Sequence, residues 1–128
     1  MPTARLEHVN ITVTDPKATA ATLCKLFGWS VRWQGAAIDD GFTVHVGTDT
    51  DYLALYRPGK PTTGPTERYT KHGALNHIGL VVPDLDEAEK AVRSAGYTIH
   101  SHYDYEPGRR FYFDGDDGVE YEIVSYAA

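Results

Sequence analysis

The sequence has little cysteine, no long apolar run and no excess of basic residues. Its single cysteine, Cys24, cannot form an internal disulfide, which fits a reducing cytoplasm. No stretch approaches the roughly 20 apolar residues that a membrane span needs, and residues 1–7 lack the apolar core of a signal peptide. The formal net charge of −6 argues against nucleic acid or an anionic membrane surface as the main partner. These absences favour a cytoplasmic protein that binds neither nucleic acid nor membranes.

Apolar and aromatic residues are what the sequence does contain. Its 128 residues are 41% hydrophobic, which suffices for one domain with a substantial core. Nine Tyr, four Phe and two Trp suit the packing of a sheet or a pocket for a flat small molecule. Composition therefore leaves both a structural and a ligand-binding use for the aromatic side chains.

The chain contains the same pattern twice. Residues 6–15 match residues 75–84 at an offset of 69, and both segments show the β-branched alternation of a strand. Two later pairs of expected strands align at an offset of 68, namely 42–46 with 110–114 and 52–56 with 120–124. Because the features keep nearly one offset, each half is predicted to be a β-α-β-β-β module.

A helix is expected after the first strand of each half, over residues 16–27 and about 85–95. Asp15 and Asp84 stand where an N-cap residue is needed, and each helix is followed by a glycine suited to a left-handed turn. The pattern thus predicts the limits of both helices as well as their existence.

The predicted fold class is α+β, with two βαβββ modules that form a curled mixed sheet around a cavity. We expect a single domain over residues 1–128, built from repeats 4–57 and 73–126. Residues 58–72 are rich in Pro and Gly and are predicted to be the linker.

Three side chains that could bind a metal ion fall on the faces turned away from the helices. His8 and His77 occupy the same register in the first strand of each repeat, and Glu122 lies mid-strand on the face opposite Tyr121 and Ile123. A carboxylate facing a closed cavity is costly unless it is compensated. Two imidazoles and a carboxylate suit Fe(II), Mn(II), Ni(II) or Zn(II), and with open positions they are typical of non-heme iron oxygenases. The alternative interpretation, exposed histidines and a surface glutamate, needs no metal.

The repeated βαβββ pattern, a histidine on each first strand and the segment 118–122 together resemble the vicinal oxygen chelate superfamily over residues 5–126. That superfamily includes glyoxalase I, fosfomycin-resistance enzymes, extradiol dioxygenases and metal-free antibiotic-sequestering proteins. The resemblance implies a glyoxalase-like fold, a divalent metal held by His8, His77 and Glu122, and a homodimer.

One position departs from the glyoxalase I pattern. The repeat aligns Glu122 with Ala54, where glyoxalase I has a carboxylate that serves as ligand and proton carrier. A set of three protein ligands instead resembles the extradiol dioxygenases and the fosfomycin enzymes.

Further residues are candidates for catalysis and substrate binding. Tyr112 stands ten residues before Glu122, a spacing that resembles the extradiol-dioxygenase motif, and His102 lies upstream of it at a longer gap than that motif usually has. These two are the candidate acid/base groups. Arg110, expected in a turn, is a candidate partner for an anionic substrate, and Asn10 for a substrate oxygen.

The predicted function is therefore that of a small metal-dependent enzyme acting on a molecule that chelates the metal through oxygens. Ala54 and Tyr112 slightly favour an extradiol-dioxygenase-like site. The alternatives are a lactoylglutathione-lyase-like or fosfomycin-resistance-like metalloenzyme, or a metal-free, bleomycin-resistance-like binding protein.

Overall fold

The computed structural model describes residues 2–63, 67–105 and 108–126. The chain divides into two compact units, unit 1 (Met1–Thr63) and unit 2 (Gly64–Ala128), and the division falls within the segment predicted as a linker. Within the described ranges, no helix is long and apolar enough to cross a membrane.

Each unit contains four strands and one main helix in the same order. Unit 1 is built from β1 (His8–Thr12), α1 (Pro16–Phe27), β2 (Ser30–Ala37), β3 (Gly41–Gly47) and β4 (Tyr52–Arg57). Unit 2 is built from β5 (Ile78–Val81), α2 (Leu85–Ser94), β6 (Ile99–Tyr105), β7 (Gly108–Asp114), the short 3₁₀ helix η1 (Asp116–Gly118) and β8 (Glu120–Ser125). The prediction of two β-α-β-β-β modules is confirmed.

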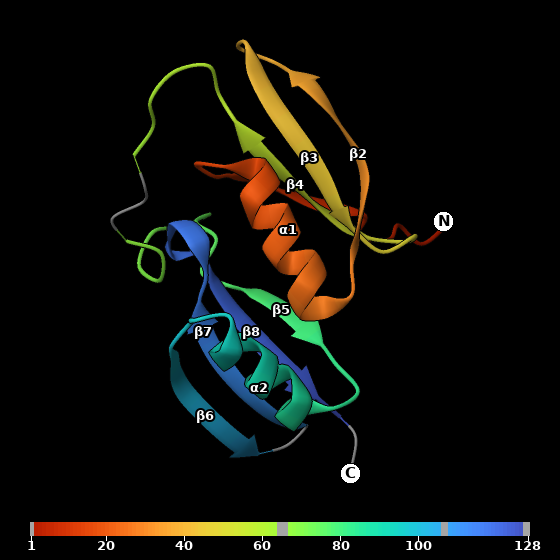
Figure 1. Ribbon diagram of the computed structural model, residues 1–128, viewed down its shortest axis with the longest axis vertical. Coiled ribbons are helices and arrows are strands. Elements are labelled where there is room, and N and C mark those ends of the chain that lie inside the picture. The colour runs from red at the N-terminus through yellow and green to blue at the C-terminus, as the bar shows by residue number, and fades with distance from the viewer. Residues whose placement is uncertain (1, 64–66, 106–107, 127–128) are drawn as a thin grey trace. The chain divides into compact units, whose positions relative to one another are not determined.

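Both sheets are mixed and have the same strand order. The order is β1-β4-β3-β2 in unit 1 and β5-β8-β7-β6 in unit 2. The last three strands of each unit form an antiparallel meander, and the first strand pairs in parallel with the fourth. In each unit the helix lies across one face of its own sheet (Figure 1). The predicted α+β class is confirmed, whereas a cavity between the halves stays a prediction.

The helices begin and end where their capping residues stand. The Asp15 side chain accepts a hydrogen bond from the Ala18 amide at 3.1 Å, and the Asp84 side chain accepts one from the Glu87 amide at 3.0 Å. Gly28 follows α1 in the left-handed region, with φ of 71°, as predicted from the absence of a Cβ. α1 has the predicted bounds, and α2 ends at Ser94, one residue before the expected end.

The cap of α2 allows a direct stability test. Asp84→Ala removes the acceptor for an N-terminal amide of the helix, and we expect a loss of about 0.5–2 kcal/mol in the free energy of unfolding. Urea denaturation followed by circular dichroism measures it. Lys90→Ala, at an exposed position of the same helix, is the control and should change stability much less. Equal losses in both variants would contradict the capping role.

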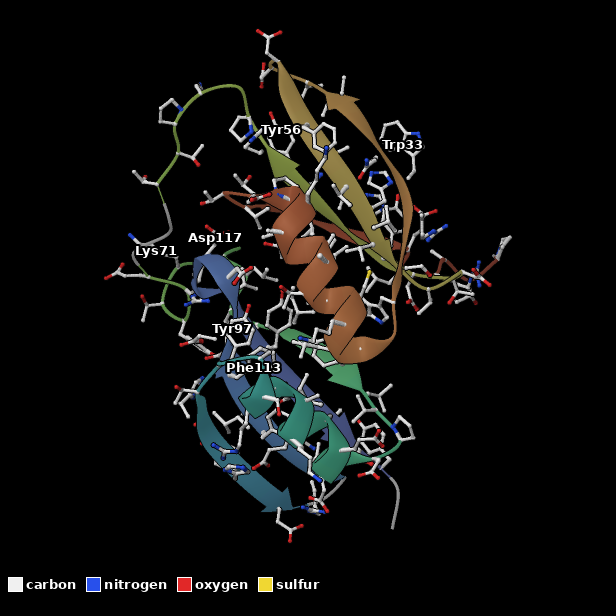
Figure 2. All side chains as sticks on the ribbon, in the orientation of Figure 1. Trp33, Tyr56, Lys71, Tyr97, Phe113 and Asp117 are labelled. Carbon is white, nitrogen blue, oxygen red and sulfur yellow. The ribbon has the colours of Figure 1, made fainter. Side chains whose placement is uncertain are left out.

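The core of each unit lies between the helix and one sheet face. In unit 2 the buried side chains of that face are Phe111, Phe113, Tyr121 and Ile123. In unit 1 the smaller side chains of Val44, Val46, Leu53 and Leu55 are buried in the same place. Figure 2 labels Phe113 and Tyr97, whose ring centroids lie 5.7 Å apart. Because strand side chains alternate, the other face of each sheet is left for polar groups.

One part of the predicted repeat alignment is wrong. Ala54 pairs with His45 in unit 1, and Glu122 pairs with Tyr112 in unit 2. Since Ala54 and Glu122 correspond at an offset of 68, His45 corresponds to Tyr112 at an offset of 67, not 68. The cause is the connection before the last strand, which runs over 48–51 in unit 1 and over 115–119, one residue longer, in unit 2.

Candidate functional site

Five of the predicted site residues belong to unit 2, and three of them, His77, Arg110 and Tyr112, meet around a fourth, Glu122. This carboxylate lies on the sheet face opposite α2, and its side chain is 14% exposed. The Tyr112 hydroxyl donates a hydrogen bond to Glu122 Oε1. Arg110 Nη1 lies 3.6 Å from Oε2, and His77 Nε2 lies 4.0 Å from Oε1. We call His77, Arg110, Tyr112 and Glu122 the Glu122 cluster.

The strand register explains why these side chains meet. Tyr112 and Glu122 are direct partners across β7 and β8, so both point to the same face. Gly79 of β5 is the partner of Glu122 on the other side. A Cβ added at Gly79 would meet Glu122 Oε2 at 3.8 Å, so the glycine leaves space beside the carboxylate.

His77 stands directly before β5 with a carboxylate near each ring nitrogen. Its Nδ1 atom is buried, has no hydrogen-bond partner among the described residues and lies 3.8 Å from Glu120 Oε2. Glu120 also accepts a hydrogen bond from the Tyr69 hydroxyl. That bond to a carboxylate favours the protonated phenol and raises the pKa of Tyr69 to about 12. Tyr69 belongs to the predicted linker, and no sequence signal pointed to this contact.

In unit 1, His8 is also paired with a carboxylate. Its Nδ1 lies 2.8 Å from Glu7 Oε1, and its ring stacks on Tyr52 with centroids 4.9 Å apart. The bond to His8 lowers the pKa of the Glu7 carboxyl. A carboxylate at Nδ1 fixes the tautomer that leaves the Nε2 lone pair available for a ligand.

A row of aromatic rings crosses the sheet of unit 1 on the face opposite α1. From His8 it continues through Tyr52 to His45, with Tyr52 and His45 centroids 4.6 Å apart, and then to Trp33 at 5.3 Å. Burial, together with the charges of His8 and Arg32, lowers the pKa of His45. Trp33 is 53% exposed at the end of the row and is labelled in Figure 2. We call His8, Tyr52, His45 and Trp33 the aromatic row.

The position in unit 1 that corresponds to Glu122 has no polar side chain. Ala54 is 2% exposed and lies between Asn10 of β1 and His45 of β3. Asn10, the predicted substrate contact, is exposed on the same face as His8. The predicted metal ligands therefore divide into His8 in unit 1 and His77 with Glu122 in unit 2, and the meeting of all three stays a prediction.

His102 lies on the other face of its sheet from Tyr112. Its Nε2 is 2.9 Å from Glu89 Oε1 of α2, and its strand partner is the buried Phe111. The nearby His100 is on the Tyr112 side, with ring centroids 6.3 Å apart. The structure thus does not bring His102 to the Glu122 cluster.

Arg110, expected in a turn, lies instead in strand β7 together with its neighbour Arg109, so the turn is wrong, whereas the strand expected over 110–114 is confirmed. Adjacent strand residues point to opposite faces, and the pair is divided accordingly. Arg109 Nη2 lies 3.1 Å from Asp86 of α2, whereas Arg110 belongs to the Glu122 cluster. Residues 106–107 before them lie outside the described part of the chain.

The chain belongs to the Glyoxalase/Bleomycin resistance protein/Dioxygenase superfamily, whose model matches residues 7–113. No curated protein matches the chain by sequence.

Solved structures share the fold over nearly the whole chain. A glyoxylase/bleomycin resistance protein/dioxygenase domain from Frankia sp. EAN1pec has a TM-score of 0.81 at 17% identity, covering 97% of this chain and 98% of that one. The fosfomycin resistance protein FosX from Listeria monocytogenes, complexed with Mn(II) and sulfate, has a TM-score of 0.73 at 16% identity, covering 98% and 93%. A FosX from Mesorhizobium loti gives 0.73 at 18% identity, covering 99% and 94%. At these identities the likeness concerns the fold alone.

Proposed function

We propose that this protein is a divalent-metal-dependent enzyme whose substrate is a small molecule that chelates the metal through oxygen atoms. His8, His77 and Glu122 would hold Fe(II), Mn(II), Ni(II) or Zn(II). The observation that carries the proposal is the Glu122 cluster, in which an imidazole, a carboxylate, a phenol and a guanidinium share one sheet face.

The donor set fits a metal ion. His77 Nε2 lies 4.0 Å from Glu122 Oε1, so a small movement of either side chain would let both atoms bind one ion at the usual bond lengths of roughly 2.0–2.2 Å. Gly79 leaves space beside the carboxylate. Glu120, near Nδ1 of His77, and Glu7, at Nδ1 of His8, are placed to orient the two imidazoles, as carboxylates commonly do for metal-binding histidines.

The other candidate residues then have distinct tasks. The bound metal would act as a Lewis acid toward a substrate oxygen. Tyr112 holds a proton at its hydroxyl beside Glu122 and is the candidate acid/base group. Arg110, whose side chain is 12% exposed, would pair with an anionic group of the substrate, and Asn10 would donate a hydrogen bond to one of its oxygens. His102 is left out because its partner is Glu89.

The site slightly favours an extradiol-dioxygenase-like reaction, in which a catechol ring is cleaved with dioxygen. Ala54 leaves only three protein ligands, so positions stay open for a chelating substrate. Tyr112, at the spacing that suggested this class, hydrogen-bonds to the proposed carboxylate ligand. A fosfomycin-resistance-like or lactoylglutathione-lyase-like reaction would use the same residues, with Arg110 toward a phosphonate or carboxylate.

A metal-free binding protein is the second candidate, and the aromatic row favours it. A ring such as that of Trp33, 53% exposed, offers a stacking surface for a flat ligand. Arg110 near Glu122 also gives that carboxylate a cationic neighbour without any ion.

Metal analysis and a substrate screen test the proposal together. We expect purified protein to contain stoichiometric Fe, Mn, Ni or Zn, and the metal-loaded protein to consume oxygen with a catechol. Fosfomycin and the methylglyoxal–glutathione adduct are parallel substrates that distinguish the two other reactions. Tight binding of a flat antibiotic with no metal would instead support the binding protein and contradict the enzyme.

We also expect a homodimer, in which the metal ligands come either from one chain or from two. Size-exclusion chromatography with light scattering measures the oligomeric state. Mixing His8→Ala protein with Glu122→Gln protein then distinguishes the arrangements, because only a site shared between chains can regain metal in the mixed dimer.

A further inference from the structure

A second group of metal-binding side chains lies at one end of the sheet of unit 2. His100, Asp114 and Glu120 each offer a ligand atom, and these atoms all lie within 4.8 Å of one another. His100 Nε2 is 3.6 Å from Asp114 Oδ1 and 3.7 Å from Glu120 Oε1. The separations exceed those of hydrogen bonds and are compatible with ligands that surround an ion.

The strands bring the three side chains together. Asp114 and Glu120 are direct partners at the ends of β7 and β8 that adjoin η1. In β6 the register shifts between Ile99 and Ser101, so His100 is the extra residue of a β-bulge. A bulge redirects a side chain, and here the imidazole of His100 lies beside the two carboxylates.

Among the described residues, the two carboxylates of this group have no permanently charged partner. Glu120 is only 12% exposed, and a largely buried carboxylate needs compensation. In the part of the chain that the structure describes, no Lys or Arg forms an ion pair with Asp114 or Glu120, and their ion-pair partners are histidines. The buried Nδ1 of His77, without a hydrogen-bond partner there, faces the same Glu120 carboxylate at 3.8 Å.

The group of His100, Asp114 and Glu120 has no counterpart at the corresponding positions of unit 1. In unit 1 the register shift falls at Arg32, whose guanidinium lies over the Tyr52 ring at 4.5 Å. Tyr52 corresponds to Glu120, and the position of Asp114 is taken by Gly47. At this place unit 1 therefore has an arginine over an aromatic ring, whereas unit 2 has two carboxylates beside an imidazole.

We propose that His100, Asp114 and Glu120 bind a second divalent cation, next to the proposed centre at His77 and Glu122. One imidazole nitrogen and two carboxylate oxygens suit Zn(II), Co(II) or Mn(II). The ion joins β6, β7 and β8 and neutralises Glu120, so that this carboxylate, which also faces His77, is held in one place.

Zinc titration of the chelator-treated, full-length protein tests this second site. Isothermal titration calorimetry with Zn(II) counts the ions, and Co(II) absorption reports their coordination. We expect His100→Ala and Asp114→Asn each to weaken the affinity for one of the two bound ions by more than about tenfold and to leave the affinity for the other unchanged. Asp114→Asn keeps the side-chain shape, so a folding defect would not be mistaken for loss of a ligand.

His102→Ala is the matched control, since His102 is on the same strand, faces α2 and should not change the number of ions. The proposal is overturned if wild-type protein binds no more zinc than His100→Ala, or if His102→Ala loses the same ion. His77→Ala separates the two sites. An ion that survives in His77→Ala and is lost in His100→Ala supports the second site, whatever becomes of the proposed enzymatic centre.

Discussion

His77→Ala is expected to reduce metal affinity at the proposed catalytic centre by more than the roughly 10–100-fold that loss of a ligand's hydrogen-bond partner costs. The reason is that an alanine removes a coordinating nitrogen outright and leaves Glu122 with one imidazole fewer. Metal-dependent turnover should fall to background in parallel. Inductively coupled plasma analysis and titration of the chelator-treated protein measure the affinity.

Glu122→Gln should give a similar loss for a different reason. The amide keeps the size of the side chain and can still accept from the Tyr112 hydroxyl, but it carries no charge for the metal. His72→Ala, at an exposed position that contributes no proposed ligand, is the control and should retain metal and turnover. Wild-type metal affinity in both His77→Ala and Glu122→Gln would contradict the proposed centre.

The faces of the strands could be predicted from the sequence because alternation depends only on local residue order. Glu122 was expected opposite Tyr121 and Ile123, and the structure buries the latter two against the helix side while Glu122 joins Tyr112 and Arg110. The helix limits were equally local, since Asp15 and Asp84 cap the amides nearest to them.

Strand register could not be predicted in the same way. The turn 115–119, one residue longer than its counterpart 48–51, shifts the offset of β7 to 67. In β6 a bulge at His100 separates His100 from His102, which strict alternation would place on one face. Both features depend on how a single extra residue is accommodated, and the order of amino acids does not fix that. The bulge therefore decides which of the two histidines lies near Tyr112.

Contacts between distant segments of the chain also could not be predicted from the sequence. Tyr69, in the predicted linker, reaches Glu120, and Glu120 in turn faces His77 and His100. Nothing in the spacing of these residues pairs them, because they meet only after the sheet of unit 2 has formed. The proximity of His100, Asp114 and Glu120 was missed for that reason.

The largest stability effect is expected at Phe111, the residue next to Tyr112 in β7. Its side chain is fully buried on the face toward α2. Phe111→Ala leaves a cavity that a packed core refills only in part, and we expect a loss of about 3–5 kcal/mol in the free energy of unfolding. Urea denaturation followed by fluorescence and circular dichroism measures this loss.

Tyr112→Phe is the informative comparison, because the two neighbours point to opposite faces of one strand. It removes a single hydroxyl that donates to Glu122, so its cost should not exceed the roughly 0.5–1.5 kcal/mol of one hydrogen bond, while turnover should fall. Phe111→Ala should show the reverse, with metal affinity per folded molecule retained under conditions where the variant is folded. A large stability loss in Tyr112→Phe and a small one in Phe111→Ala would mean that the assigned faces of β7 are inverted, and with them the location of the Glu122 cluster.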